Sequence, residues 1–294
     1  TLCRGRRLRG GAGVVKQVVM ALHAGFCFGV KRAVDAILEA LKEGRPVWTI
    51  GLPIHNPQEG DRLKGMGLRV ALDESEVPPG ADVFIRAHGE PLEVLEALRK
   101  KGARVFDMTC PFVGRAQNLA AELSQAGWHV VLLGDRQHPE IRGIMGHTDG
   151  PLDVVKDENE AALLPERPRM ALISQTTQQE ERLAAVAGVL VRRAKELHVC
   201  NTICRATMER QEAVRALLKQ VDGMVLIGGR ASANTGKLRN IAEANGMDVL
   251  WVEDAQELDD SRGWFEGRNR IGIAAGASTP EWLITEISNK IARM

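Results

Sequence analysis

The chain alternates between short apolar runs and longer stretches in which apolar residues recur at helical spacing. Runs such as Val47–Ile50 and Val130–Leu133 are rich in aliphatic residues and are typical of buried parallel strands. The spaced stretches predict helices with one buried face. Further strands are predicted at 14–22, 83–86, 104–106, 170–173, 224–227, 249–252 and 271–275. This repeated strand–loop–helix order indicates an α/β fold with parallel sheets.

Helices are predicted between these strands. One follows Cys27, and another opens at Pro91, since proline fits the first position of a helix. The spacing also predicts one long helix with Leu183, Leu190 and Leu197 on a single face. Further helices are expected from about 115, over 211–221 and after 280.

These elements group into three expected α/β domains at 17–110, 111–200 and 201–294. Residues 1–16 carry arginines interleaved with glycines and lack the apolar core of a secretory signal. We expect a disordered tail or a start-site artefact there, with Met20 as an alternative start. Cys3 lies in this tail and receives no role.

The composition is that of an ordinary globular protein, with 44% hydrophobic and 26% charged residues among 294. A net charge of +1 gives no case for nucleic acid or an anionic membrane as partner. No apolar run is long enough to span a bilayer. Five cysteines, an odd number, do not suggest a disulfide framework. We therefore expect a cytoplasmic protein in a reducing compartment.

Three of the cysteines share one setting. Cys27, Cys110 and Cys204 each precede a predicted helix, at separations of 83 and 94 residues. A helix N-terminus favours the thiolate form of a cysteine. Three such cysteines could converge on a metal cluster and leave one vertex open. The alternative for Cys27 is a buried cysteine that packs as a small hydrophobe.

Polar residues follow the carboxyl ends of several predicted strands, where ligands bind in open α/β sheets. His55, His88 and His138 each come just after an apolar run. They could share a zinc ion or an anion, or they could be structural. The loops 232–235 and 276–279 place small hydroxyl residues ahead of helices, as phosphate cradles do, although simple N-capping is the alternative. The sequence has neither a P-loop lysine motif nor a G-x-G-x-x-G fingerprint.

Glu140 lies two residues after His138 and could carry a proton to an anion site, although a solvated surface glutamate is the commoner case. Thr176 and Thr177 end a predicted strand. Their hydroxyl groups could orient that carboxyl group or a substrate, or they could cap the helix that follows.

Taken together, several stretches resemble the 4-hydroxy-3-methylbut-2-enyl diphosphate reductase family of the non-mevalonate isoprenoid pathway. The resemblance covers about residues 17–294, with the motifs in family order. It rests on the segments AGFCFGVKRAV (24–34), IHN (54–56), RAHG (86–89), DMTCP (107–111), GDRQHPE (134–140), SQTT (174–177), NTICRAT (201–207) and AGAS (275–278).

The resemblance implies a trefoil-like arrangement of three small α/β domains around a central cavity that holds an iron–sulfur cluster. It implies one [4Fe–4S] cluster per chain, held by Cys27, Cys110 and Cys204, with the fourth iron open to the substrate's allylic hydroxyl. The family removes that hydroxyl reductively to give isopentenyl and dimethylallyl diphosphate, with electrons from ferredoxin or flavodoxin. The resemblance also implies that Glu140, helped by Thr176, supplies protons. The implied substrate-binding residues are His55, His88, His138, Thr177, Ser232, Asn234 and Ser278.

The chain departs from the family pattern in two places. Ala233 stands where many members have a second serine, so one hydroxyl contact to the diphosphate is expected to be missing. Cys200 is an additional thiol that we do not assign to the cluster. Two other interpretations stay open: a three-cysteine iron–sulfur hydro-lyase, and a non-enzymatic protein with a structural zinc site. The oligomeric state is expected to be monomer or homodimer.

Overall fold

Three separate sheets with interleaved helices make up the fold, seen in a computed structural model that describes residues 5–7 and 17–294. The expected α/β class is confirmed. The chain divides into two compact units. The first contains the chain up to Lys31 together with Ile54–Leu63 and Arg205–Met294, and the second contains Arg32–Pro53 and Lys64–Cys204.

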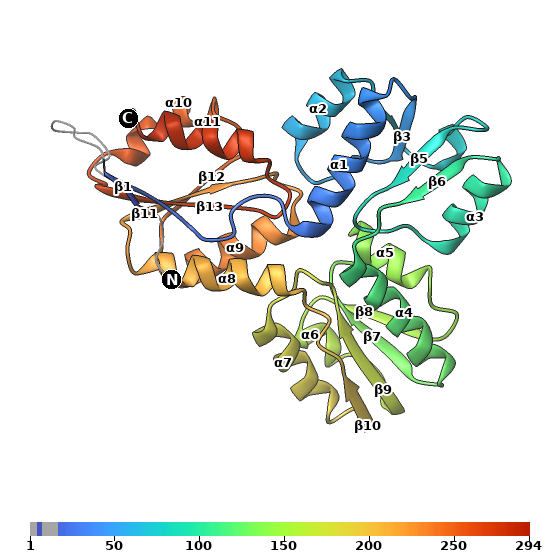
Figure 1. Cartoon of the computed structure of the whole chain (residues 1–294). Coiled ribbons are helices and arrows are strands. Elements are labelled where there is room, and N and C mark those ends of the chain that lie inside the picture. Colours follow the sequence, from blue (N-terminus) through green and yellow to red (C-terminus); the bar gives the residue numbers. More distant parts are fainter. Residues whose placement is uncertain (1–4, 8–16) are drawn as a thin grey trace. The chain divides into compact units, whose positions relative to one another are not determined.

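The first unit is built on one sheet of five strands in the order β1-β2-β13-β11-β12 (Figure 1). Only β1 runs antiparallel to its neighbour. The strands are β1 (Gly5–Arg7), β2 (Gln17–Met20), β11 (Gly223–Ile227), β12 (Val249–Val252) and β13 (Arg270–Ala275).

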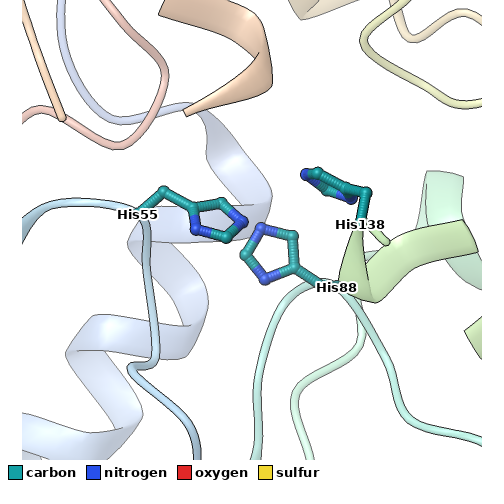
Figure 2. Close-up of side chains that lie close together, drawn as sticks. All are labelled: His55, His88 and His138. Carbon is teal, nitrogen blue, oxygen red and sulfur yellow. The ribbon is translucent and has the colours of Figure 1, made fainter. Parts of the chain in front are cut away.

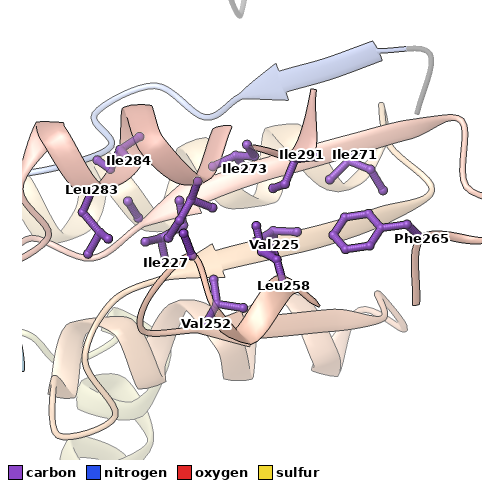
Figure 3. Packing of buried hydrophobic residues seen from close by; sticks show 13 residues of the cluster. Val225, Ile227, Val252, Leu258, Phe265, Ile271, Ile273, Leu283, Ile284 and Ile291 are labelled. Carbon is purple, nitrogen blue, oxygen red and sulfur yellow. The ribbon is translucent and has the colours of Figure 1, made fainter. Parts of the chain in front are cut away.

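Helices cover both faces of this sheet because side chains alternate between the faces along each strand. Val225 and Ile227 face a core that includes Leu283 and Ile287 of α11 (Glu281–Ile291), and Figure 3 shows this packing. Met224 and Leu226 point to the opposite face of the sheet. There they pack in a second core with residues of α8 (Arg205–Leu218) and α9 (Ala233–Ala244). The short helices α10 (Glu257–Asp260) and η2 (Arg262–Phe265) precede β13.

The second unit carries two parallel four-stranded sheets. One has the order β4-β3-β5-β6, from β3 (Val47–Ile50), β4 (Arg69–Ala71), β5 (Asp82–Ile85) and β6 (Arg104–Asp107). The other has the order β10-β9-β7-β8, from β7 (His129–Leu133), β8 (Leu152–Val155), β9 (Arg167–Ser174) and β10 (Ala194–Val199). The helices between them are α3 (Leu92–Lys100), α4 (Pro111–Gln125), α5 (Pro139–Met145), α6 (Glu158–Ala161) and α7 (Glu180–Leu190).

Two further helices link the units along the chain. The helix α1 (Phe28–Lys42) begins in the first unit and continues into the second. The helix α2 (Pro57–Gly65) lies between β3 and β4 in sequence, and a short turn η1 (Glu74–Glu76) precedes β5. Within the described ranges, no helix is both long and apolar enough to cross a membrane.

The long helix predicted through Leu197 is wrong in its second half. The helix α7 ends at Leu190, and Ala194–Val199 forms the edge strand β10. This strand pairs in parallel with β9, with His198 opposite Ala171. Pairing with β9 gives the backbone groups of this segment partners, and this tertiary gain overrides a local spacing that suited a helix.

The grouping of the first strand also differs from the expected domain 17–110. The strand β2 pairs with β13, with Val18 opposite Ile271, and thus belongs to the sheet of the C-terminal third. Part of the expected tail, Gly5–Arg7, forms β1 against β2 instead of being disordered, and so gives an otherwise open edge of β2 a partner. Residues 1–4 and 8–16, with Cys3, lie outside the described residues.

Candidate functional site

Three cysteines stand at the starts of three helices. The Cys27 carbonyl accepts the Lys31 N–H in the first turn of α1 at 2.9 Å. Cys110 is the N-cap of α4, and Cys204 directly precedes α8. The helices α4 and α8 therefore begin earlier than the expected positions near 115 and 211, immediately after their cysteines. Each of the three is only partly buried, and none of the described cysteines is in a disulfide.

The charges at the helix starts follow a pattern. Among the described α-helices, the three that follow these cysteines and α9 have no acidic residue in the first turn. Every other described α-helix has at least one. An acidic side chain at a helix N-terminus is normally favourable. Its absence at these four starts leaves the positive end of the helix dipole for an anion.

In the second unit, the predicted residues form one continuous series of contacts between two cysteine loops. The Cys110 N–H donates to the carbonyl of Ala87, next to His88, at 3.0 Å. The His88 ring meets the His138 ring edge-on, with centroids 5.4 Å apart, and Figure 2 shows both side chains. At the other end, the Cys204 N–H donates to the carbonyl of Thr176 at 3.0 Å.

Glu140 lies in the middle of this series, and it is 2% exposed. Thr176 donates its backbone N–H to one carboxylate oxygen at 2.6 Å and its hydroxyl to the other at 2.8 Å. Desolvation by burial raises the pKa of Glu140 to about 7, although both Thr176 hydrogen bonds oppose that rise. A carboxyl group with a pKa near neutrality can hold and release a proton at physiological pH.

The Glu140 N–H also fixes the ring of His138. It donates to His138 Nδ1 at 3.2 Å, where His138 is the N-cap of α5. Because Nδ1 accepts this bond, a neutral ring carries its proton on Nε2. His138 is thereby prepared to donate a hydrogen bond from Nε2.

The first unit holds the other predicted residues except Thr177, which lies in the second. Its Cys27 N–H donates to the carbonyl of Ala277 at 3.1 Å, and the neighbouring Ser278 donates its hydroxyl to the His55 carbonyl at 3.3 Å. Gly229, at the end of β11, lies against the same carbonyl, since a Cβ there would stand 2.4 Å from the His55 oxygen. Only a glycine allows this approach. The loops that follow β11 and β13 therefore meet at His55.

The start of α9 completes this group. Ser232 is its N-cap, and the Ser232 oxygen accepts the Thr235 N–H at 3.3 Å. Asn234 is 4% exposed, and neither polar atom of its amide has a hydrogen-bond partner among the described residues. A buried amide without partners is costly, by roughly 1–3 kcal/mol. We expect a ligand at the helix N-terminus to supply the missing hydrogen bonds of this amide.

Each unit thus carries one part of the predicted site residues. The first brings Cys27, His55 and Ser278 together with Ser232 and Asn234 at the ends of β11 and β13. The second joins Cys110, His88, His138, Glu140, Thr176 and Cys204 in one series. The Thr177 hydroxyl accepts a hydrogen bond from Gln175 Nε2 at 3.0 Å.

Gln175 is a residue that the sequence analysis did not assign. It is buried, and its side-chain oxygen accepts the Asp135 N–H at 3.2 Å while its nitrogen reaches Thr177. It therefore fixes the loop that leads to His138 relative to the threonine pair. Its position inside the SQTT segment was the only signal that could have singled it out.

The donor set fits an iron–sulfur cluster. Three partly exposed cysteines at helix starts without acidic side chains suit thiolate ligation of an anionic cluster. Burial raises the pKa of the Cys200 thiol, which disfavours its thiolate form. Cys200 packs against the core of the β7–β9 sheet.

These features define an α/β protein with three cysteine-bearing helix starts and a fourth helix start, that of α9, without an acidic side chain in its first turn. The chain belongs to the LytB protein family, whose pattern matches residues 18–292. Enzymes of this family are iron–sulfur proteins.

A curated relative from Aquifex aeolicus, named 4-hydroxy-3-methylbut-2-enyl diphosphate reductase, is 43% identical over 93% of this chain and 95% of its own. A solved structure of (E)-4-hydroxy-3-methyl-but-2-enyl diphosphate reductase, described as the terminal enzyme of the non-mevalonate pathway, is 43% identical in sequence to this chain. It covers 94% of this chain and 99% of its own, with a TM-score of 0.69. The corresponding reductase from Plasmodium falciparum is 23% identical, covers 95% of this chain and 88% of its own, and shares the fold with a TM-score of 0.86.

Proposed function

We propose that this chain catalyses the reductive dehydroxylation of 4-hydroxy-3-methylbut-2-enyl diphosphate to isopentenyl and dimethylallyl diphosphate. The reaction consumes two electrons and two protons and releases the hydroxyl group as water. The observation that carries the proposal is the series of contacts in the second unit, which joins the Cys110 and Cys204 loops to His88, His138 and Glu140. Membership of the LytB family and the names of relatives at 43% identity support it.

The proposal assigns the metal site to Cys27, Cys110 and Cys204, as ligands of one [4Fe–4S] cluster. When bound, such a cluster supplies electrons one at a time and an iron with an open position that acts as a Lewis acid. Cys200 is left out of the ligand set, because burial raises the pKa of its thiol and so disfavours the thiolate that binds iron. The physiological electron donor is expected to be ferredoxin or flavodoxin, and the cytoplasmic location stays a prediction.

The proposal assigns the diphosphate to the anion-binding residues. The residues that would contact it are His55, His88, His138, Thr177, Ser232, Asn234 and Ser278. Many fixed donors would orient the substrate, and holding the reacting group in place is itself catalytic. Asn234 has its amide ready for this contact. Ala233 gives no hydroxyl, so its contribution is limited to the backbone N–H.

The proposal assigns proton supply to Glu140. With a pKa of about 7, its carboxyl group is substantially protonated at neutral pH. The Thr176 hydroxyl donates to one carboxylate oxygen and so fixes the plane of the carboxyl group. After Glu140 gives up its proton, the two Thr176 hydrogen bonds would stabilise the carboxylate.

The experiment is anaerobic purification followed by analysis of iron, sulfide and zinc, and by assay with reduced methyl viologen and the substrate. We expect about four irons with matching sulfide per chain, and both olefinic products under reduction. Serine variants of Cys27, Cys110 and Cys204 should each lose iron. The matched control is Cys200→Ser, which should retain it.

Three outcomes would contradict the proposal in different ways. Zinc without sulfide would indicate a structural metal site. Iron and sulfide with no reduced product would favour a hydro-lyase that removes water without net reduction. Full iron retention in Cys110→Ser would break the ligand assignment.

A further inference from the structure

The loop that carries Cys27 is fixed from a distant part of the chain. Arg210 lies on α8, the helix that starts after Cys204, and it is 6% exposed. Its Nη2 donates to the carbonyl of Gly25 at 2.6 Å, across 185 residues of sequence. Its Nη1 donates to Ala206 within the helix at 2.8 Å. The guanidinium therefore joins the first turn of α8 to the residue two positions before Cys27.

The backbone of this loop needs such support. His23 has φ 59°, and it is the non-glycine residue of the described chain that has a positive φ. An L-residue in this region costs roughly 1–2 kcal/mol. Gly25 follows with φ +98°, and a Cβ there would stand 3.2 Å from Ile284 Cδ1. The segment between β2 and Cys27 is therefore tightly packed and partly strained.

Two other contacts define the same loop. Cys27 donates its N–H to Ala277 at 3.1 Å, so it is attached to the loop that carries Ser278. His23 lies 3.8 Å from the Glu209 carboxylate of α8, at a more exposed position. Of the contacts from α8, the one made by Arg210 is the buried one. Burial strengthens a charge-assisted hydrogen bond relative to one in water.

We propose that Arg210 is a positioning residue for Cys27. The buried guanidinium holds the Gly25 carbonyl and so fixes the direction in which the Cys27 side chain leaves the loop. It also makes the position of Cys27 depend on α8, whose first turn follows Cys204. The positioning role of Arg210 rests on the proposed function, whereas its contact with the Gly25 carbonyl can be tested without the cluster.

The test is hydrogen–deuterium exchange of the full chain, with and without iron, followed by mass spectrometry of peptides that cover 22–28. Arg210→Met should raise the exchange of the Cys27 amide about tenfold, because one charge-assisted hydrogen bond is lost. Arg210→Lys keeps the charge but loses the two-pronged geometry, and it should show a smaller rise. Peptides around Cys110 should be unchanged in both variants.

The matched control is Arg239→Met, which removes an exposed arginine paired with Glu243 on α9 of the same unit. It should leave the exchange of 22–28 unchanged. Iron content after anaerobic reconstitution gives a second readout, which should fall in Arg210→Met and not in the control. Unchanged exchange of 22–28 in both Arg210 variants, with iron retained, would overturn the proposal.

A third variant tests the positioning of the Cys27 loop if Arg210→Met does not fold. Gly25→Ala disturbs the backbone that carries the same carbonyl, since its Cβ would meet Ile284 and its φ is positive. It should raise exchange of 22–28 and lower the iron content. If Gly25→Ala leaves both unchanged, the contact has no positioning role. A wild-type chain that binds no iron would count against the proposed function alone, because the exchange experiment does not need the cluster.

Discussion

At the scale of single residues, Glu140 shows how the fold raises the pKa of a carboxyl group to about 7. The carboxyl group is buried, and its two hydrogen bonds come from Thr176 alone. Desolvation is the largest cause of the raised pKa. An ordinary glutamate would be ionised at neutral pH, so burial is what keeps part of this carboxyl group protonated there.

The raised pKa predicts how stability changes with pH. The folded pKa of about 7 lies above the ordinary value of 4.5, so protonation is more favourable in the folded chain. The resulting stabilisation is full below about pH 4.5 and is lost as pH rises through 7. Glu140→Gln removes this dependence, and at pH 8 it should be more stable than the wild type by up to about 3 kcal/mol.

Urea denaturation at pH 5 and pH 8 measures this effect. The gain from Glu140→Gln should be small at pH 5 and large at pH 8. Glu93→Gln is the control, because Glu93 is an exposed glutamate in the first turn of α3. An equal effect of Glu140→Gln at both pH values would show that Glu140 is not held protonated.

The sequence located His138 and Glu140 because they lie in one short segment after a predicted strand. It left open whether the Thr176 hydroxyl orients that carboxyl group or caps a helix, and it gave no sign that the Thr176 backbone N–H also donates to Glu140. It also gave no signal for Arg210, whose partner Gly25 lies 185 residues earlier. Side-chain contacts between distant segments depend on packing, which has no local pattern in the chain.

At the scale of elements, the side chain of Gln117 determines how α4 fits against its neighbours. It is buried, and its Nε2 would stand 2.4 Å from a Cβ at Gly89 and 3.0 Å from one at Gly143. Gly89 follows His88, and Gly143 lies on α5, three residues after Glu140. The helix that begins after Cys110 therefore packs directly against the elements that carry two predicted site residues.

This packing predicts a difference between two glycines of similar conformation. Gly89 has φ +73° and Gly102 has φ +75°, but a Cβ at Gly102 meets nothing within 4 Å. Gly102→Ala should cost only the conformational penalty, about 1 kcal/mol. Gly89→Ala should cost a further 1–3 kcal/mol or so, because the new methyl group overpacks against Gln117.

Denaturant unfolding measures the free energy of unfolding of the two alanine variants and of the double variant Gly89→Ala/Gln117→Ala. The double variant should recover part of the stability that Gly89→Ala loses. Equal destabilisation in Gly89→Ala and Gly102→Ala would mean that Gln117 simply moves aside.

Element prediction from the sequence succeeded where the apolar pattern and the tertiary environment agree. The buried strands β7 and β11 lie where their runs predict them, because both faces of each strand are covered. The segment 194–199 is an edge strand with an irregular exposure pattern, so its apolar positions could also be fitted to a helix. The starts of α4 and α8 were placed late, because neither begins with its strongest periodic stretch.

At the scale of the whole molecule, binding of an anion should stabilise the folded chain. Inorganic pyrophosphate serves as the probe for the diphosphate site. A ligand at one hundred times its dissociation constant contributes about 2.7 kcal/mol to the free energy of unfolding. We therefore expect pyrophosphate to raise the melting temperature of the wild-type chain.

Two isosteric variants on α9 separate binding from packing. Asn234→Leu should abolish the shift with pyrophosphate while leaving the free chain at least as stable, because it removes a buried amide without partners. Thr235→Val should retain the shift, since the Thr235 hydroxyl lies beside Gly228 and Gly276 inside the fold. Retention of the full shift in Asn234→Leu would contradict the assignment of this helix start.

By itself, the sequence determined the α/β class, most of the strands, the three cysteines and the polar loops that follow the strands. These features depend on hydrophobic spacing and short motifs, which are local properties of the chain. Only the tertiary structure decided that β2 joins β13, that β10 is a strand, and that the Thr176 backbone N–H joins its hydroxyl in holding Glu140. It also decided that Arg210 holds the Cys27 loop. The physical reason is that strand pairing and burial depend on contacts between segments distant in sequence. The free energy gained from these contacts outweighs the local preference of a segment for helix or strand.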